Sequence, residues 1–171
     1  MRSMAMSFAR AVCIALPLSG CIRSKGELVS IDKASTPLPA GTYYSVSNLN
    51  NGADLPALAG PTRVVIHGDS YVAIPPDAGD KPLHFHLIKL SDAGGIYILQ
   101  TDRDDDRGYR DVLIGVTGKD GFCSKDIRSY PSEAVKDDQI VSAPELLRWI
   151  SGHAAEIASM ANDVCFVRKT A

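Results

Sequence analysis

Residues 83–117, LHFHLIKLSDAGGIYILQTDRDDDRGYRDVLIGVT, decide the fold class of this chain. They hold three apolar stretches, at 83–90, 96–101 and 109–117, separated by turn material at 91–95 and 102–108. Stretches of this length, rich in β-branched and aromatic residues and bounded by Gly, Asp and Ser, are typical of strands joined by short turns. The sequence therefore predicts three consecutive antiparallel strands, the middle of a β-meander.

Strand signals continue toward the amino end. Residues 42–47 (TYYSVS), 63–67 and 71–74 have strand composition, and a short strand at 28–31 could precede them. Gly68 and Asp69 separate the last two of the three stretches and form the kind of dipeptide found in tight hairpin turns. We therefore expect a hairpin centred on these two residues.

The carboxyl-terminal third changes period. Ser142 and Glu145 form a capping-box pattern, and apolar residues recur every three to four positions from Leu146 to Met160, which predicts one amphipathic helix over 144–161. Gly152 weakens its continuity by up to ~1 kcal/mol. Residues 164–168 (VCFVR) read as a last strand. The predicted fold class is α+β: an antiparallel β-meander sheet, a C-terminal amphipathic helix packed on one face, and a final short strand.

Composition limits the function classes. The chain has 171 residues, of which 22% are charged, with a formal net charge of −2. These values fit one globular domain and exclude a disordered polyelectrolyte or a polytopic membrane protein. The near-neutral charge gives no bulk attraction for nucleic acid, and we expect no nucleic-acid partner.

The amino terminus has the order of an export signal. Arg2 and Arg10 flank a polar stretch, and residues 11–18 (AVCIALPL) are apolar. The apolar run is too short to cross a bilayer, which needs about 20 apolar residues, and Pro17 would break it as a helix. We therefore predict a secretory signal peptide over residues 1–20.

The four residues Leu18, Ser19, Gly20 and Cys21 resemble the lipobox of bacterial lipoproteins, a resemblance that covers the first 21 residues only. It implies that the signal peptidase recognises Leu18, Ser19 and Gly20, and that the Cys21 thiol takes a diacylglyceryl group, whose acyl chains are fatty acids such as palmitate, as a thioether. Two or three acyl chains anchor a protein stably, where one myristoyl chain does not. The alternative is an ordinary signal peptide followed by a structural cysteine.

The resemblance also implies a location. Lipoproteins of diderm bacteria are usually sorted to the outer membrane unless Asp follows the cysteine, and here Ile22 follows. We expect the periplasmic face of the outer membrane, or the cytoplasmic membrane in a monoderm host. Polar residues with Pro37 and Pro39 predict that 21–41 is a lipidated cysteine and tether, and that 42–171 is a single periplasmic domain.

Loss of the signal peptide changes the charge. Of 18 basic side chains, Arg2 and Arg10 leave with it, so 16 remain against 20 acidic ones, a net of −4. A mildly acidic domain is not attracted to anionic membranes. We therefore expect the lipid, rather than a basic patch, to supply membrane affinity.

Two cysteines remain once Cys13 is removed and Cys21 is lipidated. Cys123 and Cys165 form one even pair in an oxidising compartment, which predicts a disulfide. Closing this loop would contribute about 4 kcal/mol in the chain-entropy model. The alternative is a reactive thiol, but neither cysteine has a basic neighbour in sequence to lower its pKa.

His84 and His86 are the candidate metal ligands. They are two apart in a predicted strand and so project from one face, as paired imidazoles do in zinc sites. A zinc site needs a third protein ligand, for which the sequence offers His67 and His153. Two ligands alone hold a metal weakly, so we expect no cofactor; a metal-dependent hydrolase using His84 and His86 is the alternative function.

The acidic segment from Asp102 to Asp106 superficially resembles a calcium loop. An EF-hand needs glycine at its sixth position and glutamate at its twelfth, where this segment has Arg107 and Leu113. We interpret it as a solvated hairpin tip, and, if the protein binds a partner, as a loop whose charges could steer a basic one.

No other signal indicates catalysis. There is no Gly-x-Ser-x-Gly elbow, and Gly115, Gly118 and Gly121 read as a turn cluster rather than a phosphate loop. We expect Trp149 to pack against the sheet; the alternative is that it marks a partner-binding face. No catalytic residue is assigned. The sequence favours a lipid-anchored envelope protein that acts by binding an envelope protein, in an assembly, scaffold or inhibitor role; an immunity-type lipoprotein that neutralises a toxic enzyme is a special case of this function.

Overall fold

The computed structural model of the chain describes residues 21–47, 59–76, 81–91, 95–102, 108–119 and 121–169. Seven consecutive strands form an antiparallel meander, each hydrogen-bonded to the next. They are β3 (Gly41–Ser47), β4 (Ala59–His67), β5 (Ser70–Ile74), β6 (Leu83–Ser91), β7 (Ile96–Thr101), β8 (Arg110–Gly118) and β9 (Gly121–Lys125). The predicted meander is confirmed, including the hairpin turn at Gly68 and Asp69.

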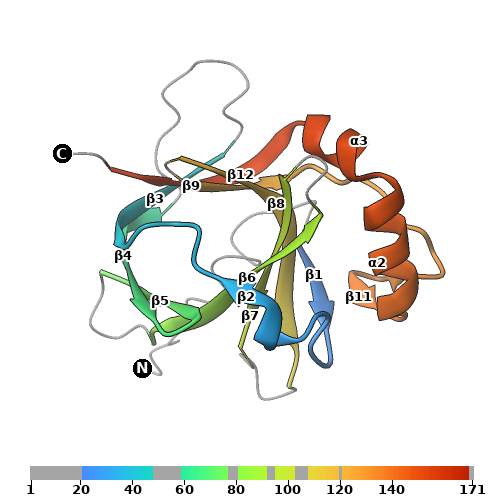
Figure 1. Ribbon diagram of the computed structural model, residues 1–171, viewed down its shortest axis with the longest axis horizontal. Coiled ribbons are helices and arrows are strands. Elements are labelled where there is room, and N and C mark those ends of the chain that lie inside the picture. Colours follow the sequence, from blue (N-terminus) through green and yellow to red (C-terminus); the bar gives the residue numbers. More distant parts are fainter. Residues whose placement is uncertain are drawn as a thin grey trace, which may run out of the picture.

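The meander closes into a barrel. The last strand, β12 (Asn162–Arg168), lies between β9 and β3 and pairs antiparallel with both. Within the described residues, β3 to β9 and β12 thus form a closed antiparallel eight-stranded barrel (Figure 1). The predicted α+β class, an open sheet with a helix on one face, is correct only in part, because the fold is mainly β and the sheet closes on itself.

Two glycines permit the close strand contacts at this closure. A Cβ atom on Gly115 of β8 would overlap the carbonyl oxygen of Cys123 in β9. A Cβ atom on Gly121 of β9 would overlap the carbonyl oxygen of Phe166 in β12. The glycine cluster that we interpret as turn material therefore has a second role, because it allows neighbouring backbones to approach.

Short strands extend the sheet outside the barrel. β1 (Cys21–Ser24) pairs with the first half of β8, β11 (Gln139–Ile140) pairs with β1 and with β10 (Val135–Lys136), and β2 (Ala34–Ser35) pairs with β6. The helical turn η1 (Ile31–Lys33) precedes β2, and no strand forms over the possible strand at 28–31.

The segment expected to be a tether is thus part of the fold. Ile22, Leu28 and Leu38 are at most 5% exposed. Each is an apolar side chain in an otherwise polar stretch, and tertiary packing outweighs the polar composition. Cys21 itself pairs directly with the barrel wall, with Leu113 of β8 as its register partner.

The barrel interior is filled by apolar side chains. They form one cluster: Leu38, Tyr43, Val64, Tyr71, Ala73, Phe85, Leu87, Leu99, Leu113 and Phe122. Tyr71 and Phe85 stack with ring centroids 5.0 Å apart. The backbone around Leu38 closes over this cluster, because the Tyr71 hydroxyl accepts from the Leu38 N–H at 2.8 Å and donates to its carbonyl at 3.1 Å. The Tyr43 hydroxyl donates to the Pro39 carbonyl at 2.6 Å.

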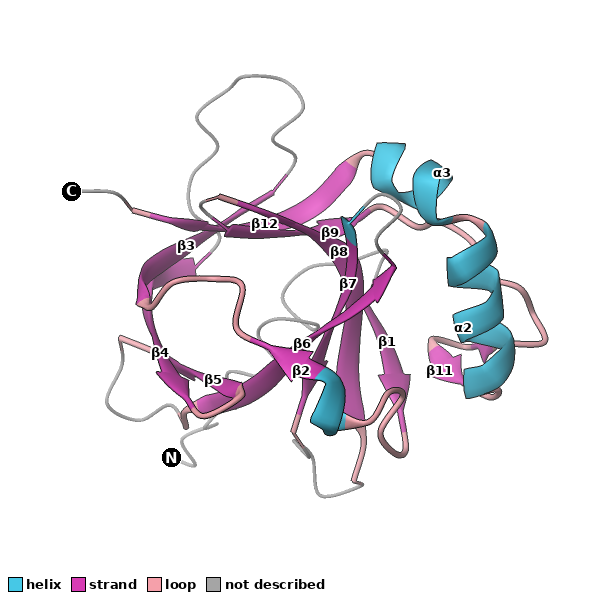
Figure 2. Cartoon of the chain, viewed as in Figure 1, coloured by secondary structure: helices cyan, strands magenta, loops and turns pink. Residues whose placement is uncertain are grey.

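A second cluster lies outside the barrel, between β6, β7 and β8 and the helices on the right of Figure 2. The helices are α2 (Ala143–Gly152) and α3 (Ala154–Ser159), which bury Leu146, Ile150, Ala154 and Ile157. The single predicted helix is divided at His153, directly after Gly152. Ser142 occupies the N-cap position as predicted, but its side chain makes no capping hydrogen bond; Glu145 instead pairs with Arg148.

The predicted disulfide between Cys123 and Cys165 is present. The two residues are directly opposite each other in the β9–β12 ladder. The bridge therefore joins the last strand of the meander to the strand that closes the barrel.

Candidate functional site

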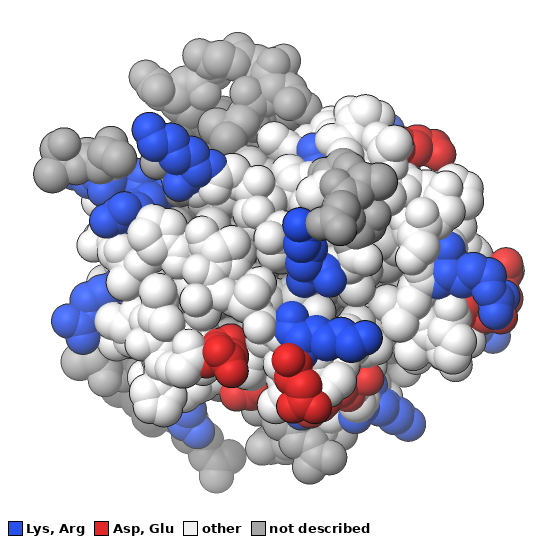
Figure 3. Space-filling model, viewed as in Figure 1, with Lys and Arg blue, Asp and Glu red and all other residues white. Residues whose placement is uncertain are grey.

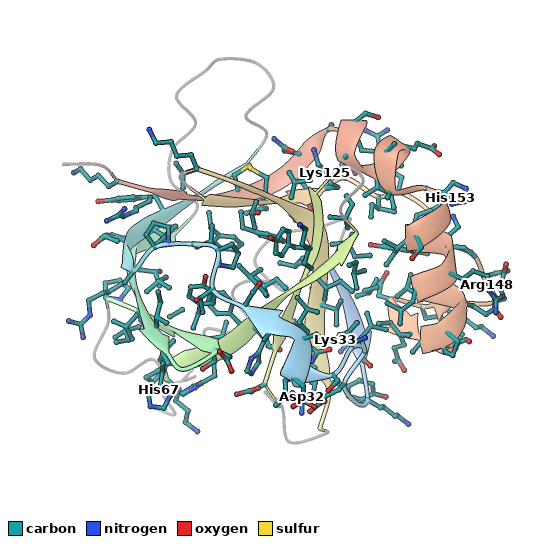
Figure 4. The ribbon with its side chains drawn as sticks, in the orientation of Figure 1. Asp32, Lys33, His67, Lys125, Arg148 and His153 are labelled. Atoms are coloured by element: carbon teal, nitrogen blue, oxygen red, sulfur yellow. A yellow bond between two sulfur atoms is a disulfide. The ribbon has the colours of Figure 1, made fainter. Side chains whose placement is uncertain are left out.

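The two candidate metal ligands differ in their exposure to solvent. His84 and His86 both lie on β6, but His84 is exposed and His86 is 8% exposed. Figure 4 shows His67 and His153 on opposite sides of the molecule, so at most one of them could lie near His84 and His86. His153 instead stacks on Trp149, with ring centroids 5.2 Å apart, and Trp149 packs partly against the outer cluster. Among the described residues, no group of three or more His, Cys, Asp or Glu side chains is placed to hold a metal ion.

His86 belongs to a different arrangement. Its Nε2 lies 3.2 Å from Oδ1 of Asp102, which directly follows β7. The same Asp102 oxygen lies 3.5 Å from the guanidinium of Arg110, the first residue of β8. A second guanidinium nitrogen of Arg110 is 3.7 Å from Glu27. Arg110 therefore ties the N-terminal segment to the ends of two barrel strands.

The β7–β8 ladder explains why these side chains meet. Gln100 pairs with Val112, so Asp102 and Arg110 fall at the open end of the ladder, where the hairpin loop begins. Thr101 closes the ladder there, because its Oγ1 accepts from the Asp111 N–H at 2.8 Å. The loop residues 103–107, which we interpret as a hairpin tip, lie outside the described residues. The ion pair at Asp102 and Arg110 marks the base of that loop.

Aromatic and basic side chains flank the loop base. The Tyr109 ring has the guanidinium of Arg23 at 5.7 Å and the ammonium of Lys25 at 5.8 Å from its centroid. Its hydroxyl donates to Gln139 at 3.2 Å. We define the loop-base surface as the following set: Arg23, Lys25, Glu27, Asp102, Tyr109 and Arg110. It combines both charges with an aromatic ring; Tyr and Arg are enriched in protein interfaces, whereas Lys, Glu and Asp are depleted there.

A buried polar pair lies beneath this surface. His86 and Gln100 are cross-strand neighbours, and the Gln100 oxygen accepts from the Leu28 N–H at 2.7 Å. His86 Nδ1 and Gln100 Nε2 are buried and have no hydrogen-bond partner among the described residues. The oxygen of Gln100 therefore fixes the N-terminal segment over the sheet. In the sequence, Gln100 stands out only as a lone amide in the apolar stretch 96–101. The strand pattern does not reveal that it binds the N-terminal segment.

The proposed lipidation residue is the first residue of β1. Cys21 is partly buried and packs against the interior cluster. Its sulfur forms a disulfide in this structure, with a partner outside the described residues. A thioether and a disulfide at one sulfur exclude each other, so lipidation would require the reduced thiol. Leu18, Ser19 and Gly20 lie outside the described residues.

Comparison with models of known protein families, with curated proteins and with solved structures finds no match to this chain. Among the described residues, no helix is long and apolar enough to cross a membrane.

Proposed function

We propose that this chain is a lipid-anchored envelope protein that acts by binding a protein partner. The lipobox at Leu18 to Cys21 supports the anchor, and the absence of Asp at position 22 favours the outer membrane of a diderm host. The partner role is an assembly, scaffold or inhibitor role, of which immunity to a toxic enzyme is a special case.

The observation that carries the binding role is the loop-base surface. Arg110 joins Asp102, Glu27 and the Thr101 carbonyl, so both ends of the loop and the N-terminal segment are held together. A fixed base lowers the conformational entropy that a loop loses when it binds. Three consecutive carboxylates, Asp104 to Asp106, lie in the loop sequence. Arg103 and Arg107 flank them and neutralise part of their charge, and the remaining negative charge would favour a basic partner.

No observation favours the hydrolase alternative. One nitrogen of His86 faces Asp102, and its other nitrogen is buried against the sheet rather than open to a substrate. His84, the second ligand of that hypothesis, has no described partner residue that would complete a metal site.

Crosslinking and affinity capture from the host's own envelope test the binding role. The bait is the full chain, compared with the loop variant Asp104→Asn/Asp105→Asn/Asp106→Asn. The matched control is Asp69→Asn/Glu133→Gln/Glu156→Gln, which removes three exposed carboxylates elsewhere. We expect one envelope protein to be enriched by the wild type and the control and lost with the loop variant.

Two results would contradict the proposal. Enrichment that survives in the loop variant would remove the loop from the interface. Recovery of background proteins only, with all three baits, would contradict a stable protein partner. A Cys21→Ser bait shows separately whether capture requires the membrane anchor.

A further inference from the structure

The structure leaves no spacer between the proposed lipid and the barrel. β1 begins at Cys21, whose register partner Leu113 lies in the middle of β8. A lipid on Cys21 is therefore attached to the barrel wall, and one face of the domain must meet the bilayer. The choice of that face rests on the proposed lipid anchor.

The direction of β1 selects an end of the barrel. β1 is antiparallel to β8, with Ser24 opposite Arg110 and Cys21 opposite Leu113. Its amino end therefore points toward the end of β8 at Gly118, about 16 Å further along at ~3.3 Å per residue. The amino group of Cys21 therefore faces the turn between β8 and β9.

Basic side chains gather at that end. Lys119 is in the turn after Gly118, and Gly121 beyond it pairs with Val167, the residue before Arg168. Lys169 follows, with its N–H bonded to the Thr42 carbonyl at 3.0 Å. Thr42 in turn pairs with Arg63 of β4. We define the basic end as these four residues: Arg63, Lys119, Arg168 and Lys169.

These charges are not neutralised within the described part of the chain. No described acidic side chain forms an ion pair with any of the four, and the Lys169 ammonium lies over the Tyr44 ring at 5.8 Å. Within their bounds, the adjacent strands β9, β12, β3 and β4 hold a single acidic residue, Asp163, near the opposite end of β12; Asp120, which follows Lys119 in the sequence, lies outside the described residues. In Figure 3, Lys and Arg atoms lie at the left of the face shown, where β12 ends and β3 begins, with no acidic atoms beside them; other Lys and Arg atoms lie nearer the acidic atoms at the centre, bottom and right.

We propose that the basic end binds the anionic phospholipid headgroups of the bilayer that carries the anchor. Each Lys or Arg near an anionic surface adds to membrane affinity, and this attraction depends on local rather than net charge. The mature net charge of −4, from which we expected no such attraction, averages over a molecule whose charges are segregated. The anchor supplies a high local concentration of headgroups, so modest attraction suffices to orient the barrel.

Vesicle binding of full-length Cys21→Ser protein tests this, because it removes the lipid and keeps the rest of the chain. The readout is the ratio of partitioning into phosphatidylcholine vesicles with and without phosphatidylglycerol. Every variant carries the same leader, with Arg2 and Arg10, so the leader's contribution cancels when the ratios of two variants are compared. The test variant adds Arg63→Gln/Lys119→Gln/Lys169→Gln. The matched control adds Lys33→Gln/Lys81→Gln/Lys136→Gln, three exposed lysines outside the basic end.

We expect the test variant to lose on the order of 100-fold in this ratio at low ionic strength, and the control to lose less than about 10-fold. Equal losses in both variants would overturn the proposal, since net charge alone would then explain binding. A ratio near one for the parent protein would also overturn it, as would tight binding to single-stranded DNA without vesicle binding. Failure of lipidation is seen separately, in the mass of the wild-type protein, and does not alter this vesicle ratio.

Discussion

The hydroxyl of Tyr71 provides a direct test that residues 34–40 belong to the fold. Tyr71 is 0% exposed, and its hydroxyl bonds both the N–H and the carbonyl of Leu38. Tyr71→Phe keeps the ring and its stacking on Phe85 but leaves two buried backbone groups without a partner. Each buried group left without a partner costs about 1 to 3 kcal/mol, and the cost is lower for a carbonyl, which has a second lone pair for other contacts. We therefore expect the free energy of unfolding to fall by about 2 to 4 kcal/mol.

Urea unfolding followed by circular dichroism measures this loss. With a slope of about 1 to 3 kcal/mol per molar, the midpoint should fall by roughly 1 to 2 M while the slope stays constant. Tyr44→Phe is the matched control, because Tyr44 is only partly buried and its ring can still face Lys169. An unchanged midpoint for Tyr71→Phe would contradict the anchoring of Leu38 and restore a tether that is independent of the barrel.

Three further predictions concern the barrel itself. Cys123→Ala/Cys165→Ala should unfold with a stability lower by up to about 4 kcal/mol in a thermal or urea experiment, and two titratable thiols in denatured, unreduced Cys13→Ser/Cys21→Ser protein would disprove the bridge. Gly115→Ala should lower the free energy of unfolding by about 3 kcal/mol or more, because the new methyl group meets the Cys123 carbonyl. Gly118→Ala is the control: no atom lies within 4 Å of its Cβ position, so the free energy should change by less than about 0.5 kcal/mol. Similar losses for both variants would contradict the close contact at Gly115. Burial raises the pKa of Tyr71 to about 12, so its contribution is complete below pH 10 and is lost as the pH rises from 10 to about 12; a wild-type stability that is flat across this range, measured against Tyr71→Phe, would argue against it.

The sequence predicted the parts of the fold that depend on local pattern. The stretches at 96–101 and 71–74 coincide with β7 and β5 because strand composition and turn residues agree there. Barrel closure was not predictable in this way. It depends on β12 pairing with β9 and β3 at once, and the one sequence trace of that contact, the pairing of Cys123 with Cys165, fixes only the β9 side.

The N-terminal segment shows the opposite failure. Its composition is that of a linker, and a few apolar residues, of which Ile22, Leu28 and Leu38 are the most buried, help to hold it in place. Their anchoring partners come from distant strands, such as Tyr71 and Gln100, so no local pattern reveals them. The strand pattern predicted that His86 lies in a strand. Its contact with Asp102 depends on the register between β6 and β7, which the pattern does not specify.

Lipidation of Cys21 would carry the barrel directly on the membrane, and both proposals about location depend on it. The most direct measurement is the intact mass of the wild-type protein purified from its host's membranes, with fragmentation of the amino-terminal peptide. We expect a chain that begins at Cys21 and carries a diacylglyceryl thioether with one further acyl group at most. A mature chain that begins elsewhere, or an unmodified Cys21 thiol or disulfide in the membrane-extracted protein, would contradict the lipid anchor.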